Sequence, residues 1–127
     1  MLLGGKMTAI PITTWPQLRD FALALNLPEV TVDYPHGHES LKAHGKLWCH
    51  WSPYVDAAVF RAARDEREML MLADPETFIL HPHYAKHDYV LVRAGRIDPD
   101  WARARLITRW RDNAPKRYLR EWDARND

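Results

Sequence analysis

The sequence predicts a single α+β domain in which helices cover one face of a mostly antiparallel sheet. Three observations support this prediction. The chain has 127 residues, which is enough for one hydrophobic core and too few for two full domains. Its composition is globular, with 46% apolar and 28% charged residues. Helical and strand patterns follow one another in the order α-β(3)-α-β(2)-α, without an internal repeat.

The first expected helix runs from Trp15 to Leu25. Thr14 and Gln17 fit a capping box, which supplies partners for free backbone N–H groups of the first turn. Apolar residues then recur at helical spacing, so one face of this helix is suited to burial. Asn26 can terminate the helix, and Pro28 lies just beyond it, where a helix cannot readily continue.

Three strands are expected after a loop that spans residues 28–38. They cover residues 39–43, 46–51 and 57–62. His44 and Gly45 separate the first two strands as a tight turn, because glycine adopts a positive φ without steric penalty. Strict alternation along the second strand directs Cys49 to one face of the sheet and both Trp48 and His50 to the other.

The middle of the chain predicts a second helix and two more strands. The helix begins near Asp65, whose side chain caps it together with Glu68 three residues later. Met69, Leu72 and Ala73 share its expected buried face, and the helix ends before the next proline. Strands follow at residues 78–80 and 89–92, and the second of these is rich in β-branched residues.

A third helix begins at Asp98 and Pro99, because aspartate suits the cap and proline suits the first helical position. Its expected buried side contains Leu106, Ile107, Trp110 and Ala114, and its expected solvated side contains Arg105, Arg109 and Asp112. Pro115 ends or kinks this helix. The domain therefore comprises residues 14–120, between a flexible leader at residues 1–13 and a tail at residues 121–127.

Charge and cysteine content limit the partners and the compartment. Eighteen Lys and Arg against seventeen Asp and Glu leave a net charge of +1, so any electrostatic partner must bind a local patch. Cys49 is the only cysteine, which excludes an intrachain disulfide and favours a cytoplasmic location. No segment approaches the roughly 20 apolar residues that span a bilayer, and no membrane partner is expected.

The seven histidines are the first candidate site, because His36 and His38 are close in sequence, as are His81, His83 and His87. They are compatible with a small-molecule or metal site in loops. The sequence nevertheless favours ordinary surface imidazoles, since no regular helix is expected there to bring them onto one face. Neither a metal nor any other cofactor is expected.

Catalytic motifs are also missing from the sequence. There is no Gly-x-Ser-x-Gly elbow, phosphate-binding glycine loop or dinucleotide fingerprint among the five glycines. Cys49 falls inside a predicted strand, where a small core residue is the simpler interpretation than a nucleophile. The sequence therefore predicts no catalytic residues and a protein that is not an enzyme.

Basic residues give a further candidate surface. The segment 96–127 has more basic than acidic residues with aromatic residues interleaved, as nucleic-acid contacts require, but its arginines are spread around the helix. Arginine stems that cover apolar surface explain this pattern equally well. A better cationic cluster than these arginines would form if folding brings five other residues together. They are Lys116, Arg117, Lys86, His83 and His87.

Several ordered motifs together resemble the MmcQ/YjbR family of small bacterial proteins. They are Leu-Pro-Glu-Val at 27–30, Gly-Lys at 45–46, Ala-Asp-Pro-Glu-Thr-Phe at 73–78, His-Tyr-Ala-Lys-His-Asp-Tyr-Val-Leu-Val at 83–92 and Ala-Pro-Lys-Arg at 114–117. The resemblance implies an α-β(3)-α-β(2)-α fold, similar to type III secretion chaperones and described as CyaY-like. It also implies the family's usual label, a DNA-binding protein, and no catalytic residue.

The leading hypothesis is a non-enzymatic DNA-binding protein whose cations contact the nucleic-acid backbone. The expected contacts are Lys46, His83, Lys86, His87, Lys116 and Arg117. Binding by such contacts tolerates any sequence and weakens steeply with salt. The alternative is a protein-interaction module that uses an exposed sheet face or edge strand, as in the secretion chaperones.

Overall fold

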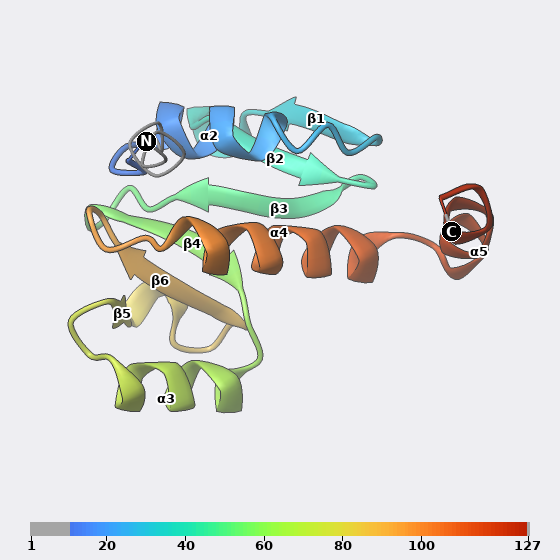
Figure 1. Ribbon diagram of the computed structural model, residues 1–127. Helices are drawn as coiled ribbons and strands as arrows, with labels where there is room; N and C mark the ends of the chain where they lie inside the picture. The colour runs from blue at the N-terminus through green and yellow to red at the C-terminus, as the bar shows by residue number, and fades with distance from the viewer. Residues whose placement is uncertain (1–10, 127) are drawn as a thin grey trace, which may run out of the picture.

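The computed structural model describes residues 11–126 and confirms a single α+β domain (Figure 1). Its helices are α2 (Trp15–Leu23), α3 (Arg64–Ala73), α4 (Pro99–Asn113) and α5 (Lys116–Arg125). Its strands are β1 (Val30–Asp33), β2 (Ser40–Ala43), β3 (Lys46–Trp51), β4 (Ala57–Arg61), β5 (Phe78–Ile79) and β6 (Tyr89–Arg93). They form one sheet in the order β1-β2-β3-β4-β6-β5, and all these pairings are antiparallel.

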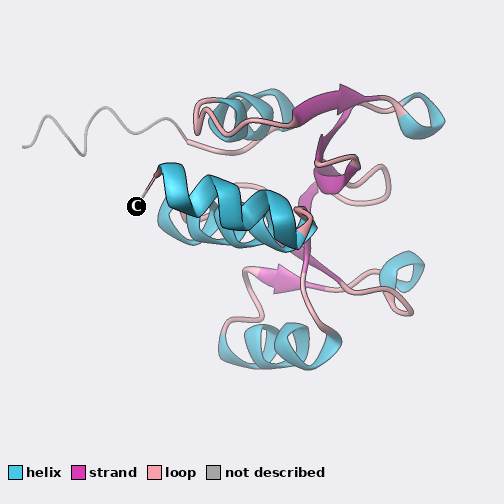
Figure 2. Cartoon of the chain, turned by 90° about the vertical axis from the view of Figure 1, so that its right-hand side faces the viewer, coloured by secondary structure: helices cyan, strands magenta, loops and turns pink. Residues whose placement is uncertain are grey.

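The sheet has two different faces. When the sheet is viewed edge-on, the α-helices all cover one of its faces, as predicted (Figure 2). We call this face the inner face. The opposite side, the outer face, bears two short 3₁₀ helices, η1 (Pro35–Gly37) and η2 (Pro82–Tyr84). No helix within residues 11–126 has the length and apolar character needed to cross a membrane.

Strand β1 corrects the prediction of a loop over residues 28–38. Val30 pairs with Ala43 and Asp33 pairs with Ser40, so β1 forms an edge of the sheet. The Lys42 ammonium lies 3.0 Å from the Asp33 carboxylate across this pair. The four residues Val-Thr-Val-Asp are too few to show a period between the flanking proline-containing turns, which is why the sequence pattern concealed this strand.

The predicted helix caps and hairpin turn are largely confirmed. Thr14 caps α2 by accepting a hydrogen bond from the Gln17 backbone N–H, and Asp98 caps α4 in the same way from Trp101. α2 ends at Leu23, two residues earlier than predicted. In the turn between β2 and β3, His44 and Gly45 have φ values of 55° and 79°, as a two-residue hairpin of this type requires.

Helix α3 turns a different face inward from the one predicted. Met69 and Leu72 are 71% and 86% exposed, whereas Arg67 is only 4% exposed. Asp65 does not cap the helix either, because Ala63 occupies the cap position and the Asp65 carboxylate accepts from the neighbouring Glu66 N–H. Residues 69–72 are all apolar, so the sequence alone did not determine which of them face the core.

A β-bulge in β3 corrects the predicted alternation. Leu41 pairs with Cys49 and Lys42 pairs with Leu47, so two residues of β2 face three of β3. Trp48 and Cys49 consequently both lie in the core on the inner face, while His50 lies on the outer face. Burial raises the pKa of the Cys49 thiol far above its usual range, which suits a core residue and not a nucleophile.

The main core lies between the inner face and helices α2 and α4. The Trp48 indole donates to the Leu106 carbonyl and the Trp110 indole donates to the Pro28 carbonyl, both at 2.8 Å. These two bonds satisfy the only polar atoms of the two largest buried side chains. Arg105, predicted to be solvated, has a side chain only 12% exposed because it bonds Glu66 across the α3–α4 contact.

The packed structure extends beyond both expected domain boundaries. Ile12 is buried in the core although it falls within the expected leader, of which residues 1–10 lie outside the described part of the chain. At the other end, α5 continues to Arg125, so the expected tail is largely helical. Tyr118, Leu119 and Trp122 of this helix pack against the core.

Candidate functional site

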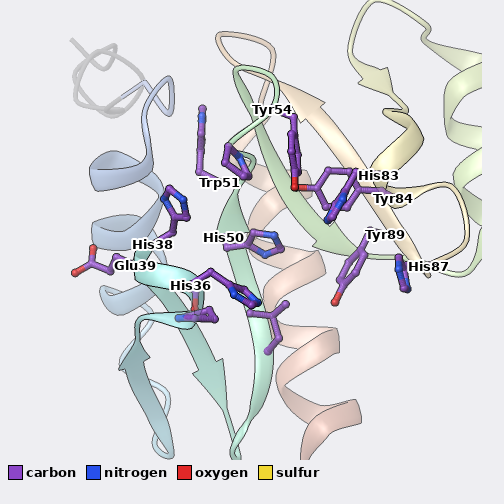
Figure 3. A pocket seen from close by; sticks show the side chains of 14 residues that line it. His36, His38, Glu39, His50, Trp51, Tyr54, His83, Tyr84, His87 and Tyr89 are labelled. Carbon is purple, nitrogen blue, oxygen red and sulfur yellow. The ribbon is translucent and has the colours of Figure 1, made fainter.

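A pocket of about 750 Å³ opens on the outer face between η1 and η2 (Figure 3). It is unusually rich in imidazoles and aromatic rings. The described residues that line it are Pro35, His36, His38, Glu39, Ser40, Leu47, His50, Trp51, Pro53, Tyr54, His83, Tyr84, His87 and Tyr89. Its volume lies in the range of small-molecule sites, about 300–1,000 Å³.

His50 lies at the centre of the pocket, between residues of the η1 and η2 sides. Its ring contacts Tyr89 edge-to-face, with centroids 6.0 Å apart, and lies 6.4 Å from Tyr84. Its Nδ1 atom is buried and has no hydrogen-bond partner among the described residues. Burial, with a smaller contribution from His83, lowers the pKa of His50 to about 4. The imidazole is therefore neutral at pH 7, with one donor and one acceptor nitrogen.

Ser52 joins the two loops of the η2 side. Its Oγ lies 3.2 Å from the Tyr84 hydroxyl and accepts a hydrogen bond from the Tyr54 backbone N–H at 3.1 Å. The Tyr54 ring is half exposed, stacks on His81 at 5.0 Å and lies 4.5 Å from His83. The η2 side of the pocket therefore has exposed aromatic surface.

Arg67 of α3 fixes the segment that contains η2 and the start of β6. Its guanidinium donates to the carbonyl oxygens of Tyr84, Ala85, His87 and Tyr89 at 3.0–3.3 Å. None of the ion pairs within residues 11–126 involves this buried cation, so the four carbonyl dipoles take the place of a carboxylate. The backbone around Lys86 is thereby held in one conformation.

Glu39 lines the η1 side, but its carboxylate points away from the pocket toward α2 (Figure 3). It accepts hydrogen bonds from the Trp15 indole at 2.7 Å, from Arg19 at 2.9 Å and from the Tyr34 hydroxyl at 3.1 Å. The bonds from Trp15 and then Arg19 lower the pKa of Glu39, so it remains ionised. Because these donors occupy it, Glu39 is not available as a general base in the pocket.

The histidines do not form a recognisable metal centre. Across residues 11–126, no three His, Cys, Asp or Glu side chains are grouped as ligands of one metal ion. Five of the seven histidines line the same pocket, however, which the sequence did not predict. These imidazoles place hydrogen-bonding groups and ring surface around one pocket.

The structure places the predicted cations in two groups. His83 and His87 line the pocket, and Lys86 lies between them on the same loop. Lys46 begins β3, and Lys116 and Arg117 form the first turn of α5. That turn adjoins the β2–β3 hairpin, since Tyr118 packs 4.7 Å from His44 (Figure 1).

The predicted cations also differ in whether they form ion pairs with carboxylates. Arg117 forms an ion pair with Glu121 at 3.5 Å, which neutralises part of its charge. Lys46, Lys86 and Lys116 are exposed, and none of them forms an ion pair with another described residue. These three lysines therefore keep their full charge within the described part of the chain.

Sequence reasoning missed several residues that shape the pocket. His50, Tyr54 and Tyr89 were not selected, because no motif relates them and only tertiary structure brings them together. Arg67 was also missed. Arg67 lies three and four residues before Leu70 and Met71, and this helical spacing indicates that the three residues share one face of α3.

The protein is thus a small α+β protein with one antiparallel sheet, helices on its inner face and a pocket on its outer face. A family model described as YjbR matches residues 25–112. This match covers more than half of the chain and all six strands, and the chain belongs to the YjbR family. Comparison with curated proteins and with solved structures found no match.

Proposed function

We propose that this YjbR-family protein is a non-enzymatic DNA-binding protein of the bacterial cytoplasm. The supporting observation is the exposed Lys86, which lies in sequence between His83 and His87, two residues that line an aromatic pocket. Phosphate-binding groups thus lie next to surfaces on which bases can stack, the combination used by proteins that bind single strands. The lone, buried thiol of Cys49 is compatible with a reducing compartment.

The charge distribution favours contacts to phosphate over contacts to base edges. Lys86 is exposed, and the nearby imidazoles of His83 and His87 are exposed as well. Lysine acts on phosphate as a point charge and gives no sequence information. Lys46 and Lys116 form a second group of exposed lysines, at the start of β3 and of α5. Binding is therefore expected to tolerate any sequence and to weaken with salt.

Fluorescence anisotropy with labelled single-stranded and duplex DNA of the same sequence tests this function. The logarithm of the association constant should fall with the logarithm of salt concentration, with a slope of about 0.7 per phosphate contacted in a single strand. Lys86→Gln should reduce both affinity and slope. Arg103→Gln removes an exposed cation from α4, on the inner side of the sheet, and serves as the matched control.

Two results would reject the proposal. One is the lack of association with either DNA at low salt. The other is equal loss of affinity in Lys86→Gln and Arg103→Gln, which would mean that only overall charge matters. In contrast, a selective loss in Lys86→Gln supports a binding surface on the outer face.

The second candidate function is a protein-interaction module, which the exposed side chains of Met69 and Leu72 favour. These two residues of α3 are 71% and 86% exposed, in a helix that also carries exposed carboxylates. Exposed apolar groups of this kind occur at protein contacts. A partner retained after nuclease treatment and high salt, and lost in the Met69→Lys variant, would support this function over DNA binding.

A further inference from the structure

We propose that the outer-face pocket holds a single unstacked nucleobase, with His50 as the residue that hydrogen-bonds to its edge. If the base belongs to a DNA strand, this inference rests on the proposed DNA-binding function. A free nucleotide carries the same base edge, so the base in the pocket can come from a strand or from a free nucleotide. Both sources share a planar nitrogen heterocycle in the pocket and a phosphate outside it.

The size and lining of the pocket suit a planar ring. Its volume of about 750 Å³ exceeds that of one base and leaves room for the attached sugar. Trp51, Tyr54 and Tyr89 provide ring surfaces around it (Figure 3). Every base has two π-faces, so such surfaces accept any of the four.

The polar groups of the pocket suit a neutral ligand edge. The buried Nδ1 of His50 has no partner within residues 11–126, and a buried polar atom without a hydrogen bond is costly. The two nitrogens of a neutral imidazole point to different sides of the ring, so His50 makes one hydrogen bond to a base edge, as donor or acceptor according to its tautomer. Because Nδ1 is closed to solvent, a base edge in the pocket would meet the His50 ring at its Nε2 atom, which is not among the buried unpartnered atoms of the described chain.

Charged groups lie around the pocket and not inside it. None of the described lining residues is a lysine or arginine, and Glu39 is occupied by hydrogen bonds on the α2 side. A phosphate buried at His50 would consequently lack a permanent countercharge. Lys86 is exposed and precedes the lining residue His87, so a phosphate that bonds it remains in contact with water. This arrangement orients a nucleotide with its base inward and its phosphate outward.

Three probes test the inference with the full chain at pH 7. They are a single-stranded oligonucleotide, an abasic oligonucleotide of the same length, and free nucleoside monophosphates. The base-containing strand should bind about tenfold more tightly than the abasic strand, the size expected for one stacked base. NMR spectra of the labelled protein should show that the monophosphates shift the His50 and Tyr54 resonances.

Variants locate the site. Tyr54→Ala removes a half-exposed ring, and His50→Phe keeps a ring but removes both nitrogens; each should lower the preference for the base-containing strand by about tenfold. Leu72→Ala, on exposed α3 surface, is the control and should leave the preference unchanged. Thermal unfolding of each variant verifies that it is folded.

The outcomes separate this inference from the proposed function. If both strands bind equally and the variants have no effect, the base pocket is rejected while DNA binding stands. If no strand binds but monophosphates shift the His50 resonance in the wild type and not in Tyr54→Ala, DNA binding is rejected and the pocket assignment stands with a free nucleotide as its ligand. If no probe binds, both proposals are rejected.

Discussion

The Nη1 atom of Arg67 donates a hydrogen bond to the main-chain oxygen of Tyr84 at 3.3 Å, which joins the buried side of α3 to the wall of the outer-face pocket. The same guanidinium also bonds the carbonyls of Ala85, His87 and Tyr89. Arg67 thus sets the backbone conformation of the loop that contains Lys86. A helix on the inner side of the sheet positions groups that lie on the outer side.

Arg67→Met should therefore destabilise the protein and disorder the pocket loop. The substitution keeps the length of the side chain but leaves the carbonyl oxygens without their donor, and the expected loss is about 2–4 kcal/mol of unfolding free energy. Urea denaturation measures it. Arg64→Met, on the same helix, is the control, because it removes only an exposed ion pair with Asp88, which contributes less than about 1 kcal/mol. A loss below about 0.5 kcal/mol in Arg67→Met would contradict the role assigned to Arg67.

The low pKa of His50 makes stability depend on pH. In the unfolded chain this histidine titrates near 6.5, whereas in the folded protein its pKa is about 4. Between these values the unfolded state binds more protons, so the unfolding free energy falls as the pH is lowered from about 6.5 to about 4. The contribution of His50 is up to about 3 kcal/mol.

His50→Phe should flatten part of this pH profile. Urea denaturation at pH 7 and pH 4.5 provides the comparison, and the wild type should lose more stability than the variant over this interval. Burial also lowers the pKa of His44, so the variant retains some pH dependence. Parallel profiles for the two proteins would show that His50 is not held neutral by its surroundings.

Helix α5 should depend on aromatic packing for its position. The Trp122 ring lies 5.1 Å from Trp110, and Tyr118 lies 4.7 Å from His44. Trp122→Ala removes a large, partly buried ring and should cost about 2–3 kcal/mol, with faster amide hydrogen exchange confined to α5. Arg120→Ala, exposed on the same helix, should cost less than about 0.5 kcal/mol. Equal effects of the two substitutions would mean that α5 does not pack on the core.

Local chemistry was sufficient to predict most of the fold. The caps at Thr14 and Asp98 and the turn at His44 and Gly45 follow from hydrogen bonds and φ angles within a few residues. The helix that starts at Lys116 was missed because Pro115 was interpreted only as the end or kink of the preceding helix, whereas this proline occupies the N-cap of a new helix.

The candidate site was only partly predictable, because it is assembled by tertiary contacts. His83, Lys86 and His87 are close in sequence and were selected from it. His50 lies on the face opposite Cys49, as alternation predicts, and the β-bulge in β3 moves Trp48 from the face of His50 to the inner face. The register of β2 against β3 is not visible in a single sequence, so strict alternation was the only available rule.

The orientation of α3 provides the sharpest comparison between the sequence prediction and the structure. The sequence suggested that Met69 and Leu72 are core residues, but the structure exposes them and packs Leu70 against the core. Met69→Gln and Leu72→Gln should therefore change the unfolding free energy by less than about 0.5 kcal/mol, as for other exposed sites. Leu70→Gln places an amide against the core without an evident partner and should cost about 2–3 kcal/mol.

Urea denaturation of the three single variants decides between the two orientations of α3. The side chains at positions 69, 70 and 72 are all unbranched at Cβ, and glutamine is a good helix former, so helix propensity changes little among the variants. Burial is then the main difference between them. If Met69→Gln or Leu72→Gln proves as costly as Leu70→Gln, these side chains are covered, either by another part of the chain or by a second molecule. A dependence of that cost on protein concentration identifies the second molecule as another copy, because only association makes stability concentration-dependent.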